Sequence, residues 1–351
     1  MKLFRTIFFA ALLALSSCMD YGPVDEEEFY ASGDGLFIVN EGNFMYGNAS
    51  LSYYDPITKK VENEIFARSN GFKLGDVAQS MTIWDSLGWT VVNNSGVIFA
   101  IDLNTFKEEG RITGFTSPRH IHFISRQKAY VTQLWDPRIY VVNPITSQIT
   151  GYVTTDMDYD TGSTEMMVQY GKYLFTNCWS YQNRILKIDT ETDKVVGQLT
   201  VGIQPSCILL DANGKLWTLT DGGVKGASFG NEAPALYCID AESFKIERVF
   251  NFTIEDTPLS LTLSGDGETL FWLNGDVWSM DVNATHLPVK QLFESSSTRC
   301  YAMTVSPVNG EIYVADAIDY VQNGVIMRYS PEGELIDRFN VGICPGAFCW
   351  R

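Results

Sequence analysis

Short apolar runs separated by polar turns repeat along most of the chain, and the stretch from 128 to 214 contains nearly the same pattern twice. Runs of about five residues bounded by Gly, Pro, Asn and Asp are typical of β-strands. A unit of four such strands that recurs every roughly 40–45 residues indicates the blade of a β-propeller. The two clearest copies consist of the runs Ala129–Gln133, Ile139–Val142 and Gln148–Val153, and then Tyr173–Asn177, Ile185–Ile188 and Val195–Thr200.

The same template fits the rest of the chain and predicts an all-β fold, a seven-bladed β-propeller of four-stranded blades. The pattern opens on a second strand, Leu36–Asn40, and finishes on a first strand, Gly346–Trp350. Pairing of these two strands in one blade would close the ring and remove its exposed sheet edge. No segment of the ring has a helical period. Fourth strands, the outermost of each blade, are expected at Val61–Phe66, Lys107–Ile112, Gln148–Val153, Val195–Thr200, Ile246–Phe250, Val289–Phe293 and Leu335–Phe339.

Blade topology divides the connections between two faces of the ring. Connections from first to second and from third to fourth strands are short turns, such as Asp102–Thr105 and Asp211–Gly214. Connections on the opposite face are long, irregular and aromatic, beyond what the fold requires, and such loops often carry function. We therefore predict the ligand-binding residues on that face: Phe44, Tyr46, Phe72, Trp135, Asp136, Asp158, Tyr159, Trp179, Tyr181, Phe229 and Tyr320.

The N-terminal segment has the features of a lipoprotein signal peptide. A basic start with Lys2 and Arg5 precedes an apolar stretch too short to span a bilayer, and Leu-Ser-Ser-Cys18 follows. We expect a signal peptide over 1–17, an acidic tether over 18–35 lipidated at Cys18, and the propeller over 36–351. The lipid on Cys18 would be the only membrane attachment. By composition alone, the tether is equally well described as a plain flexible linker.

Charge and metal-ligating residues narrow the range of partners. The chain has 25 basic and 42 acidic residues and a formal charge of −17, which disfavours binding to phosphate backbones, so no nucleic-acid partner is expected. Asp156, Asp158 and Asp160 resemble the start of a calcium loop. However, the loop lacks Gly at its sixth position and an acid at its twelfth, so it is either a weak calcium site or a solvated loop.

Two further motifs suggest catalysis only weakly. Gly226–Gly230 matches the Gly-x-Ser-x-Gly nucleophile pattern, but it falls in a long loop of an all-β fold instead of a strand–turn–helix. His120 and His122 project to one side of an inner strand, and two histidines do not make a metal site without further ligands. We therefore predict no catalytic residues, no metal and no enzymatic activity.

The motifs Ala129-Tyr-Val-Thr132, Ile139–Thr146 and Thr200-Val-Gly-Ile-Gln-Pro205 resemble those of the YncE-like propellers over about 36–351. Together with Cys18 and the acidic leader, the chain is similar to the BtuG-type surface lipoproteins. This resemblance implies a lipid-anchored outer-membrane protein that faces the cell exterior. It also implies capture of cobalamin or other corrinoids and their transfer to a TonB-dependent transporter. Related propellers are also called surface-layer proteins.

The aromatic residues, interleaved with amides and acids, suit a large, flat, partly apolar ligand with a polar rim. A corrin has apolar faces and a rim of amide side chains, and it fits this description. Two alternatives stay open: a surface propeller that binds protein or glycan, and an axial-metal lyase or hydrolase.

Overall fold

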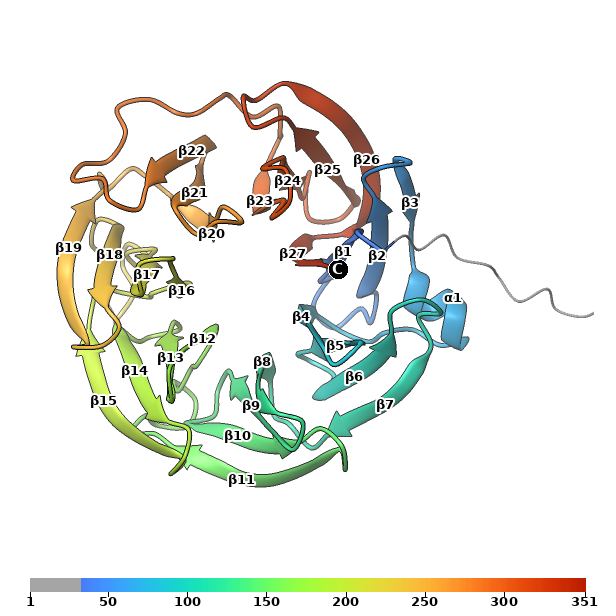
Figure 1. The fold of residues 1–351 in the computed structure, drawn as a ribbon, viewed down its shortest axis with the longest axis horizontal. Coiled ribbons are helices and arrows are strands. Elements are labelled where there is room, and N and C mark those ends of the chain that lie inside the picture. Colours follow the sequence, from blue (N-terminus) through green and yellow to red (C-terminus); the bar gives the residue numbers. More distant parts are fainter. Residues whose placement is uncertain (1–32) are drawn as a thin grey trace, which may run out of the picture.

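The computed structural model describes residues 33–351, which form a ring of seven antiparallel sheets around an axis (Figure 1). The seven-bladed, all-β prediction is confirmed. The predicted signal peptide, the predicted lipidation site Cys18 and most of the predicted tether lie outside the described residues. From the axis outwards, blade 1 contains β27 (Pro345–Trp350), β1 (Leu36–Asn40), β2 (Ser50–Asp55) and β3 (Lys60–Glu62).

The other blades follow in chain order. Blade 2 contains β4 (Ala78–Trp84), β5 (Leu87–Val92), β6 (Val97–Asp102) and β7 (Glu108–Thr113). Blade 3 contains β8 (Pro118–Ser125), β9 (Lys128–Gln133), β10 (Arg138–Asn143) and β11 (Gln148–Thr154). Blade 4 contains β12 (Met167–Tyr170), β13 (Tyr173–Cys178), β14 (Arg184–Asp189) and β15 (Lys194–Thr200). Blade 5 contains β16 (Leu209–Leu210), β17 (Lys215–Thr220), β18 (Ala235–Asp240) and β19 (Lys245–Asn251). Blade 6 contains β20 (Leu259–Leu263), β21 (Thr269–Asn274) and β22 (Asp276–Asp281). Blade 7 contains β23 (Cys300–Val305), β24 (Ile312–Asp316), β25 (Asn323–Tyr329) and β26 (Leu335–Ile343).

Strand β27 closes the ring as the sequence predicted. It pairs antiparallel with β1, with Phe348 opposite Ile38 and Cys349 opposite Phe37. The indole of Trp350 donates a hydrogen bond of 3.0 Å to the Thr304 hydroxyl of blade 7, which ties the closing strand to its other neighbour. Blade 1 therefore combines strands from the two ends of the ring.

The predicted fourth strand Val61–Phe66 is wrong beyond Glu62. A short helix, α1 (Ile65–Asn70), follows β3 and lies on the outside of the ring (Figure 1). Its side chains Ile65 and Phe66 are buried, and Gly71 ends it in the left-handed conformation. No side chain caps its N-terminus, so packing of two apolar residues accounts for the helix.

Blade 6 lacks the predicted fourth strand Val289–Phe293, and it is the one three-stranded sheet within residues 33–351. The segment is a loop that meets β22 at Val277, through an isolated bridge to Phe293 and a hydrogen bond from the Leu292 N–H. Val289 is fully exposed, and Pro288 before it has no N–H to donate to a ladder. Part of the outer edge of β22 is therefore unpaired.

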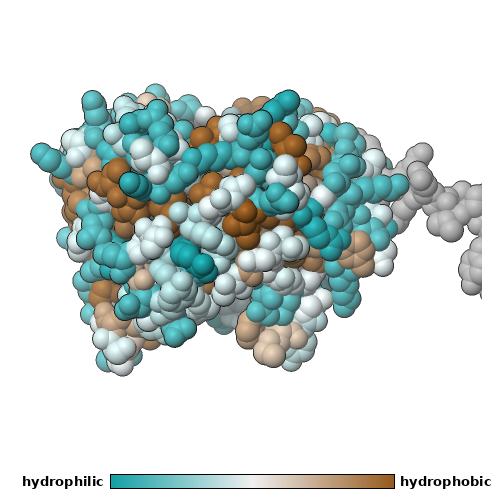
Figure 2. Space-filling view, turned by 90° about the horizontal axis from the view of Figure 1, so that it is seen from below, coloured by the Kyte–Doolittle hydropathy of each residue, from teal (hydrophilic) through white to brown (hydrophobic). Residues whose placement is uncertain are grey.

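The core lies between neighbouring blades, because each sheet is buried on both faces. The largest fully buried side chains include Trp217, Trp272, Tyr54 and Tyr130. The outer wall of the disc mixes polar and apolar residues, and one face extends into two projections (Figure 2). All six cysteines of the described chain are free. Among residues 33–351 no helix is long and apolar enough to cross a membrane.

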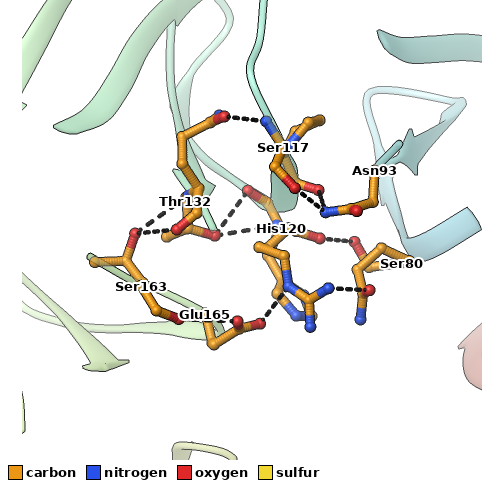
Figure 3. Close-up of polar contacts among 12 residues, drawn as sticks. Ser80, Asn93, Ser117, His120, Thr132, Ser163 and Glu165 are labelled. Carbon is orange, nitrogen blue, oxygen red and sulfur yellow. Dashed lines mark hydrogen bonds and ion pairs between the residues drawn. The ribbon is translucent and has the colours of Figure 1, made fainter. Parts of the chain in front are cut away.

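Buried polar side chains link successive blades near one face. Asn93, which follows β5, donates hydrogen bonds to the Ser117 hydroxyl and the Pro118 carbonyl at the start of blade 3 (Figure 3). Asn177 in β13 donates equivalently to the carbonyl of Pro205 before blade 5. An asparagine at the end of a second strand thus satisfies a carbonyl in the approach to the next blade.

Candidate functional site

The first strands of the seven blades line an axial channel of about 650 Å³. Each first strand begins at the face that carries the long connections, which we call the loop face; the opposite face is the turn face. Polar side chains lie at the loop-face end of these strands, and apolar ones such as Met81 and Met303 lie further along. The channel mouth on the loop face is therefore polar, and its interior mixes apolar side chains with polar ones such as Thr82 and His122.

Irregular pairing marks this mouth. The register between first and second strands shifts near the loop face in five blades: at Ala78/Ser80, Pro118/Ile121, Leu259/Thr262, Cys300/Ala302 and Val39/Asn40. A bulge breaks the alternation of side chains and re-aims those beside it. The residues at the mouth consequently come from positions that simple strand alternation would not select.

An ion pair spans the mouth between blades 3 and 4. Arg119 Nε donates to Glu165 Oε2 at 2.7 Å, and the Ser163 hydroxyl donates to the other oxygen of Glu165 (Figure 3). Arg119 Nη1 also donates to the side-chain oxygen of Gln79 in blade 2. The Arg119 and Glu165 side chains are only 14% and 5% exposed, so each depends on the other for neutralisation.

A second carboxyl group, that of Glu41, lies beside the mouth and has no cationic partner in direct contact among residues 33–351. The Tyr301 hydroxyl donates to Glu41 Oε2 at 2.6 Å. Burial raises the pKa of Glu41 from its ordinary value, and the Tyr301 hydrogen bond and the charge of Arg119 partly offset this rise. Gly346 of β27 provides the space, because a Cβ there would lie 2.1 Å from Glu41 Oε1.

Trp179 lines the channel from the β13–β14 connection. Its indole Nε1 donates to Asp221 Oδ2 at 3.0 Å, and the Gly223 N–H donates to the other oxygen of Asp221. Burial raises the pKa of Asp221, and these two hydrogen bonds act in the opposite direction. Trp179 is therefore a fixed part of the mouth and not a freely exposed platform.

The two channel histidines are unsuited to acid–base work near neutral pH. Desolvation and the charge of Arg119 lower the pKa of His120 to about 3. Desolvation also lowers the pKa of His122, against a hydrogen bond with Gln169. Within residues 33–351 no group of three or more His, Cys, Asp or Glu side chains could hold a metal ion.

Three predicted site residues do come together, and we call them the Trp135 cluster: Trp135, Tyr181 and Phe229. The ring centroids of Trp135 and Tyr181 are 6.0 Å apart, and those of Tyr181 and Phe229 are 4.9 Å apart. The three rings come from connections of blades 3, 4 and 5. Trp135 is 40% exposed and Tyr181 is 46% exposed.

Backbone hydrogen bonds hold the loops of this cluster in place. The Trp135 N–H donates to the Gly162 carbonyl at 2.8 Å, and the Gln204 N–H donates to the Gln182 carbonyl at 2.8 Å. Trp135 and Tyr181 have φ of 64° and 58°. Left-handed backbone costs a bulky residue about 1–3 kcal/mol and is common at binding sites. The two rings are thus presented by ordered, strained loops.

A second group, the Tyr320 cluster, lies in blades 1 and 7 and contains Phe44, Tyr46 and Tyr320. Asn43 Nδ2 donates to the Tyr320 carbonyl at 2.6 Å, which joins the two connections. Phe44 and Tyr46 are 65% and 76% exposed. The Tyr320 ring packs edge-on against Tyr301, so this cluster borders the channel mouth.

Other predicted site residues lie apart from both clusters. Phe72 follows α1 and packs against Phe66 and Phe99 on the outer side of the ring. Phe72 therefore packs beside α1 and joins neither cluster, and a part in binding stays a prediction for it. Asp136 is buried, and its oxygens accept hydrogen bonds from Arg138 and Tyr140.

The acidic loop that follows β11, with Asp156, Asp158 and Asp160, is exposed and lies beside Arg138. The Tyr159 ring lies 5.8 Å from the Arg138 guanidinium. Asp156, Asp158 and Asp160 are all exposed, and Asp156 forms an ion pair of 2.8 Å with Arg184. Calcium binding here stays a prediction. Gly226–Gly230 lies in the β17–β18 connection with no helix after it, so it lacks the strand–turn–helix of a nucleophile elbow.

Comparison with known proteins assigns the family. The profile of a family described as a domain of unknown function, DUF5074, matches residues 34–343. The chain belongs to the DUF5074 family. A search of curated proteins finds no match.

Solved structures resemble this DUF5074 propeller in fold. A quinonprotein alcohol dehydrogenase-like protein from Bacteroides thetaiotaomicron has a TM-score of 0.68 at 14% identity, over 90% of this chain and 78% of that one. A functionally unknown protein from Desulfotomaculum acetoxidans has a TM-score of 0.67 at 13% identity, over 91% and 99%. The periplasmic gluconolactonase of Pseudomonas aeruginosa has a TM-score of 0.66 at 12% identity, over 90% and 99%. Their names differ in activity, and at these identities they show the fold alone.

Sequence reasoning missed the groups that converge on the mouth of this DUF5074 propeller: Glu41, Arg119, Asp221 and Tyr301. Each lies within or beside a first strand or just after a second strand, where the chain reaches the loop face. Strand alternation pointed to His120 instead of Arg119, because the register shift between Pro118 and Ile121 was not foreseen. A useful signal would have been charged or hydroxylated residues next to each strand start.

Proposed function

We propose that this protein is a non-enzymatic binder of a large, flat, partly apolar ligand at the loop face. The observation that carries the proposal is a pair of aromatic groups, the Trp135 cluster and the Tyr320 cluster. They lie in blades on either side of one polar channel mouth. The loops that present them are joined by hydrogen bonds. Preformed loops lower the ordering cost of binding, and aromatic rings supply apolar contact area.

We further propose a corrinoid, such as cobalamin, as the ligand. The support is the resemblance of the strand and loop motifs to the BtuG-type lipoproteins, together with the chemistry of the face. A corrin would lay its apolar macrocycle on the aromatic rings and its amide rim on polar groups. In this proposal Cys18 carries the lipid anchor at the outer membrane, the protein faces the exterior, and a TonB-dependent transporter receives the ligand.

The test uses the colour of the ligand. Purified protein without residues 1–17 is mixed with cyanocobalamin and passed through a desalting column, and titration calorimetry gives the affinity. The red colour should elute with the protein at a 1:1 ratio. If all the colour stays on the column with the free ligand and none elutes with the protein, the corrinoid proposal is wrong. Binding to surface glycans or to a protein would then support the broader binding role, and chelator-sensitive turnover would support an enzyme.

A further inference from the structure

We infer that the channel mouth is a subsite for a primary carboxamide, the group that an amide side chain of the ligand would insert between the two aromatic clusters. The inference rests on the proposed function and deepens it. Glu41, Gln79 and Arg119 each keep hydrogen-bonding capacity beyond their contacts within the described chain.

The acceptor of the subsite is Glu41. Its Oε2 accepts from the Tyr301 hydroxyl, and Oε1 has no hydrogen-bond partner within residues 33–351. A carboxylate oxygen accepts about two hydrogen bonds. No cation of the described chain pairs directly with Glu41, unlike Glu165, which Arg119 neutralises. Glu41 Oε1 therefore has unused capacity for an N–H donor.

The donors of the subsite are Arg119 and Gln79. Arg119 uses Nε on Glu165 and Nη1 on Gln79, which leaves Nη2 without a partner in the described chain. The side-chain oxygen of Gln79 accepts from Arg119, and Gln79 Nε2 has no hydrogen-bond partner among residues 33–351. Both side chains line the channel. The mouth thus offers N–H donors beside an acidic acceptor.

A primary carboxamide matches this combination best. Its oxygen accepts from the Arg119 and Gln79 donors, and its NH₂ group donates to Glu41. A carboxylate ligand would also accept from the donors, but it has no N–H to donate to Glu41 and would bring a second acidic group against it. An ammonium would satisfy Glu41, but it would face Arg119 and leave both donors unused. The arrangement consequently discriminates an amide from the isosteric acid.

Gly346 permits a test that moves Glu41 without removing it. The three atoms nearest to a Cβ at position 346 all belong to the Glu41 side chain, at 2.1, 2.7 and 3.0 Å. Gly346 does not have a positive φ, so alanine fits its backbone. Gly346→Ala should therefore displace the carboxyl group while the rest of β27 keeps its pairing.

The experiment compares cyanocobalamin with its monocarboxylic derivatives, in each of which one amide side chain is a carboxylate. Affinities are measured by calorimetry for the wild type, Glu41→Gln, Gly346→Ala and a control, Glu255→Gln, an exposed acid on the loop face. The wild type should bind at least one acid derivative about tenfold or more weakly than cyanocobalamin, as expected for loss of a charge-assisted hydrogen bond. In Glu41→Gln and Gly346→Ala this ratio should fall towards one, and in Glu255→Gln it should stay.

The outcomes separate the two proposals. If the wild type binds no cyanocobalamin, both the proposed function and this subsite are wrong. If it binds cyanocobalamin but the ratio is unchanged in both Glu41→Gln and Gly346→Ala, the ligand assignment stands and the subsite is wrong. Thermal unfolding confirms that each variant is folded, and Gly346→Ala keeps the test valid should Glu41→Gln fail to fold.

Discussion

The two faces of the ring use the same backbone conformation for different purposes. On the turn face, five third-to-fourth turns each contain a residue of positive φ: Lys59, Phe106, Ser147, Asp193 and Phe244. Each turn also begins with an Asp or Asn whose side chain accepts N–H groups of the turn, as Asp102 does from Asn104 and Thr105. In four of these blades the third and fourth strands that the turn joins also shift register beside it. The same hydrogen bonds within the turn, repeated from blade to blade, account for the positive φ in each of these five turns.

On the loop face, the positive φ values of Trp135, Tyr181 and Tyr320 follow no repeat. Each holds a half-exposed aromatic ring, and no common turn motif surrounds them. The difference shows that repetition in this chain serves stability, whereas departures from the repeat mark recognition. We therefore expect substitutions in the repeated framework to lower stability, and substitutions in the loop-face aromatic residues to lower binding.

Trp217→Ala should give the largest effect and act on stability alone. Trp217 is fully buried in β17, and its indole N–H donates to Asp211, which shapes a turn of the turn face. Deleting such a side chain leaves a cavity and should lower the free energy of unfolding by about 3–5 kcal/mol. Urea unfolding measures the loss, and Trp217→Phe is the control that keeps most of the volume. A loss of affinity for cyanocobalamin in the folded variant would contradict the separation of the two faces.

Replacing Trp135 and Tyr181 together by alanine should act on binding alone. Removal of two aromatic contacts should weaken cyanocobalamin binding about 10- to 100-fold, or about 1.4–2.7 kcal/mol. The melting temperature should stay nearly constant, because both rings are half exposed. Tyr152→Ala, an exposed tyrosine on β11 of the outer wall, is the matched control. A large drop in melting temperature would mean that the Trp135 cluster is a packing element.

The pH dependence of stability should reveal a contribution from His120 at the channel mouth, which grows gradually as the pH falls. Its pKa of about 3 lies below the ordinary value of 6.5, so the unfolded chain binds the proton more readily between these pH values. Stability conferred by the neutral imidazole is present above pH 6.5 and is lost as the pH falls towards 3. The slope attributable to this group is about 1.4 kcal/mol per pH unit.

His120→Gln should therefore lose less stability on acidification than the wild type over this range. Chemical unfolding at several pH values measures the slopes, with His286→Gln, an exposed histidine, as the control. If the unfolding free energy of His120→Gln and that of the wild type change equally with pH, His120 has the same proton affinity in the folded and the unfolded protein.

The sequence predicted the ring well because the repeat itself encodes it. Second and third strands were placed to within a residue or two, since each is an apolar run ended by turn residues. The helix α1 was missed because six residues without an N-cap give no periodic signal. The loop Val289–Phe293 was taken for a strand because apolar residues there resemble the repeat, although Pro288 interrupts it.

The candidate site was only partly predictable. Topology alone put Trp135, Tyr181 and Phe229 on one face, and the structure brings their rings together. Topology could not show that the Phe72 ring packs against Phe66 of α1 and Phe99 of β6. Arg119, Glu41 and Tyr301 depend on bulges and on contacts between distant blades, and neither leaves a local pattern in the sequence.

The pairing of β27 with β1 has a consequence for how the protein is made. The ribosome delivers β1 before any other strand of the ring and β27 after all of them. Throughout synthesis β1 lacks its inner neighbour, so a nascent chain that stops early keeps an unsatisfied strand edge available to proteases and chaperones. Ring closure therefore waits until β27, the last strand of the propeller, has been translated.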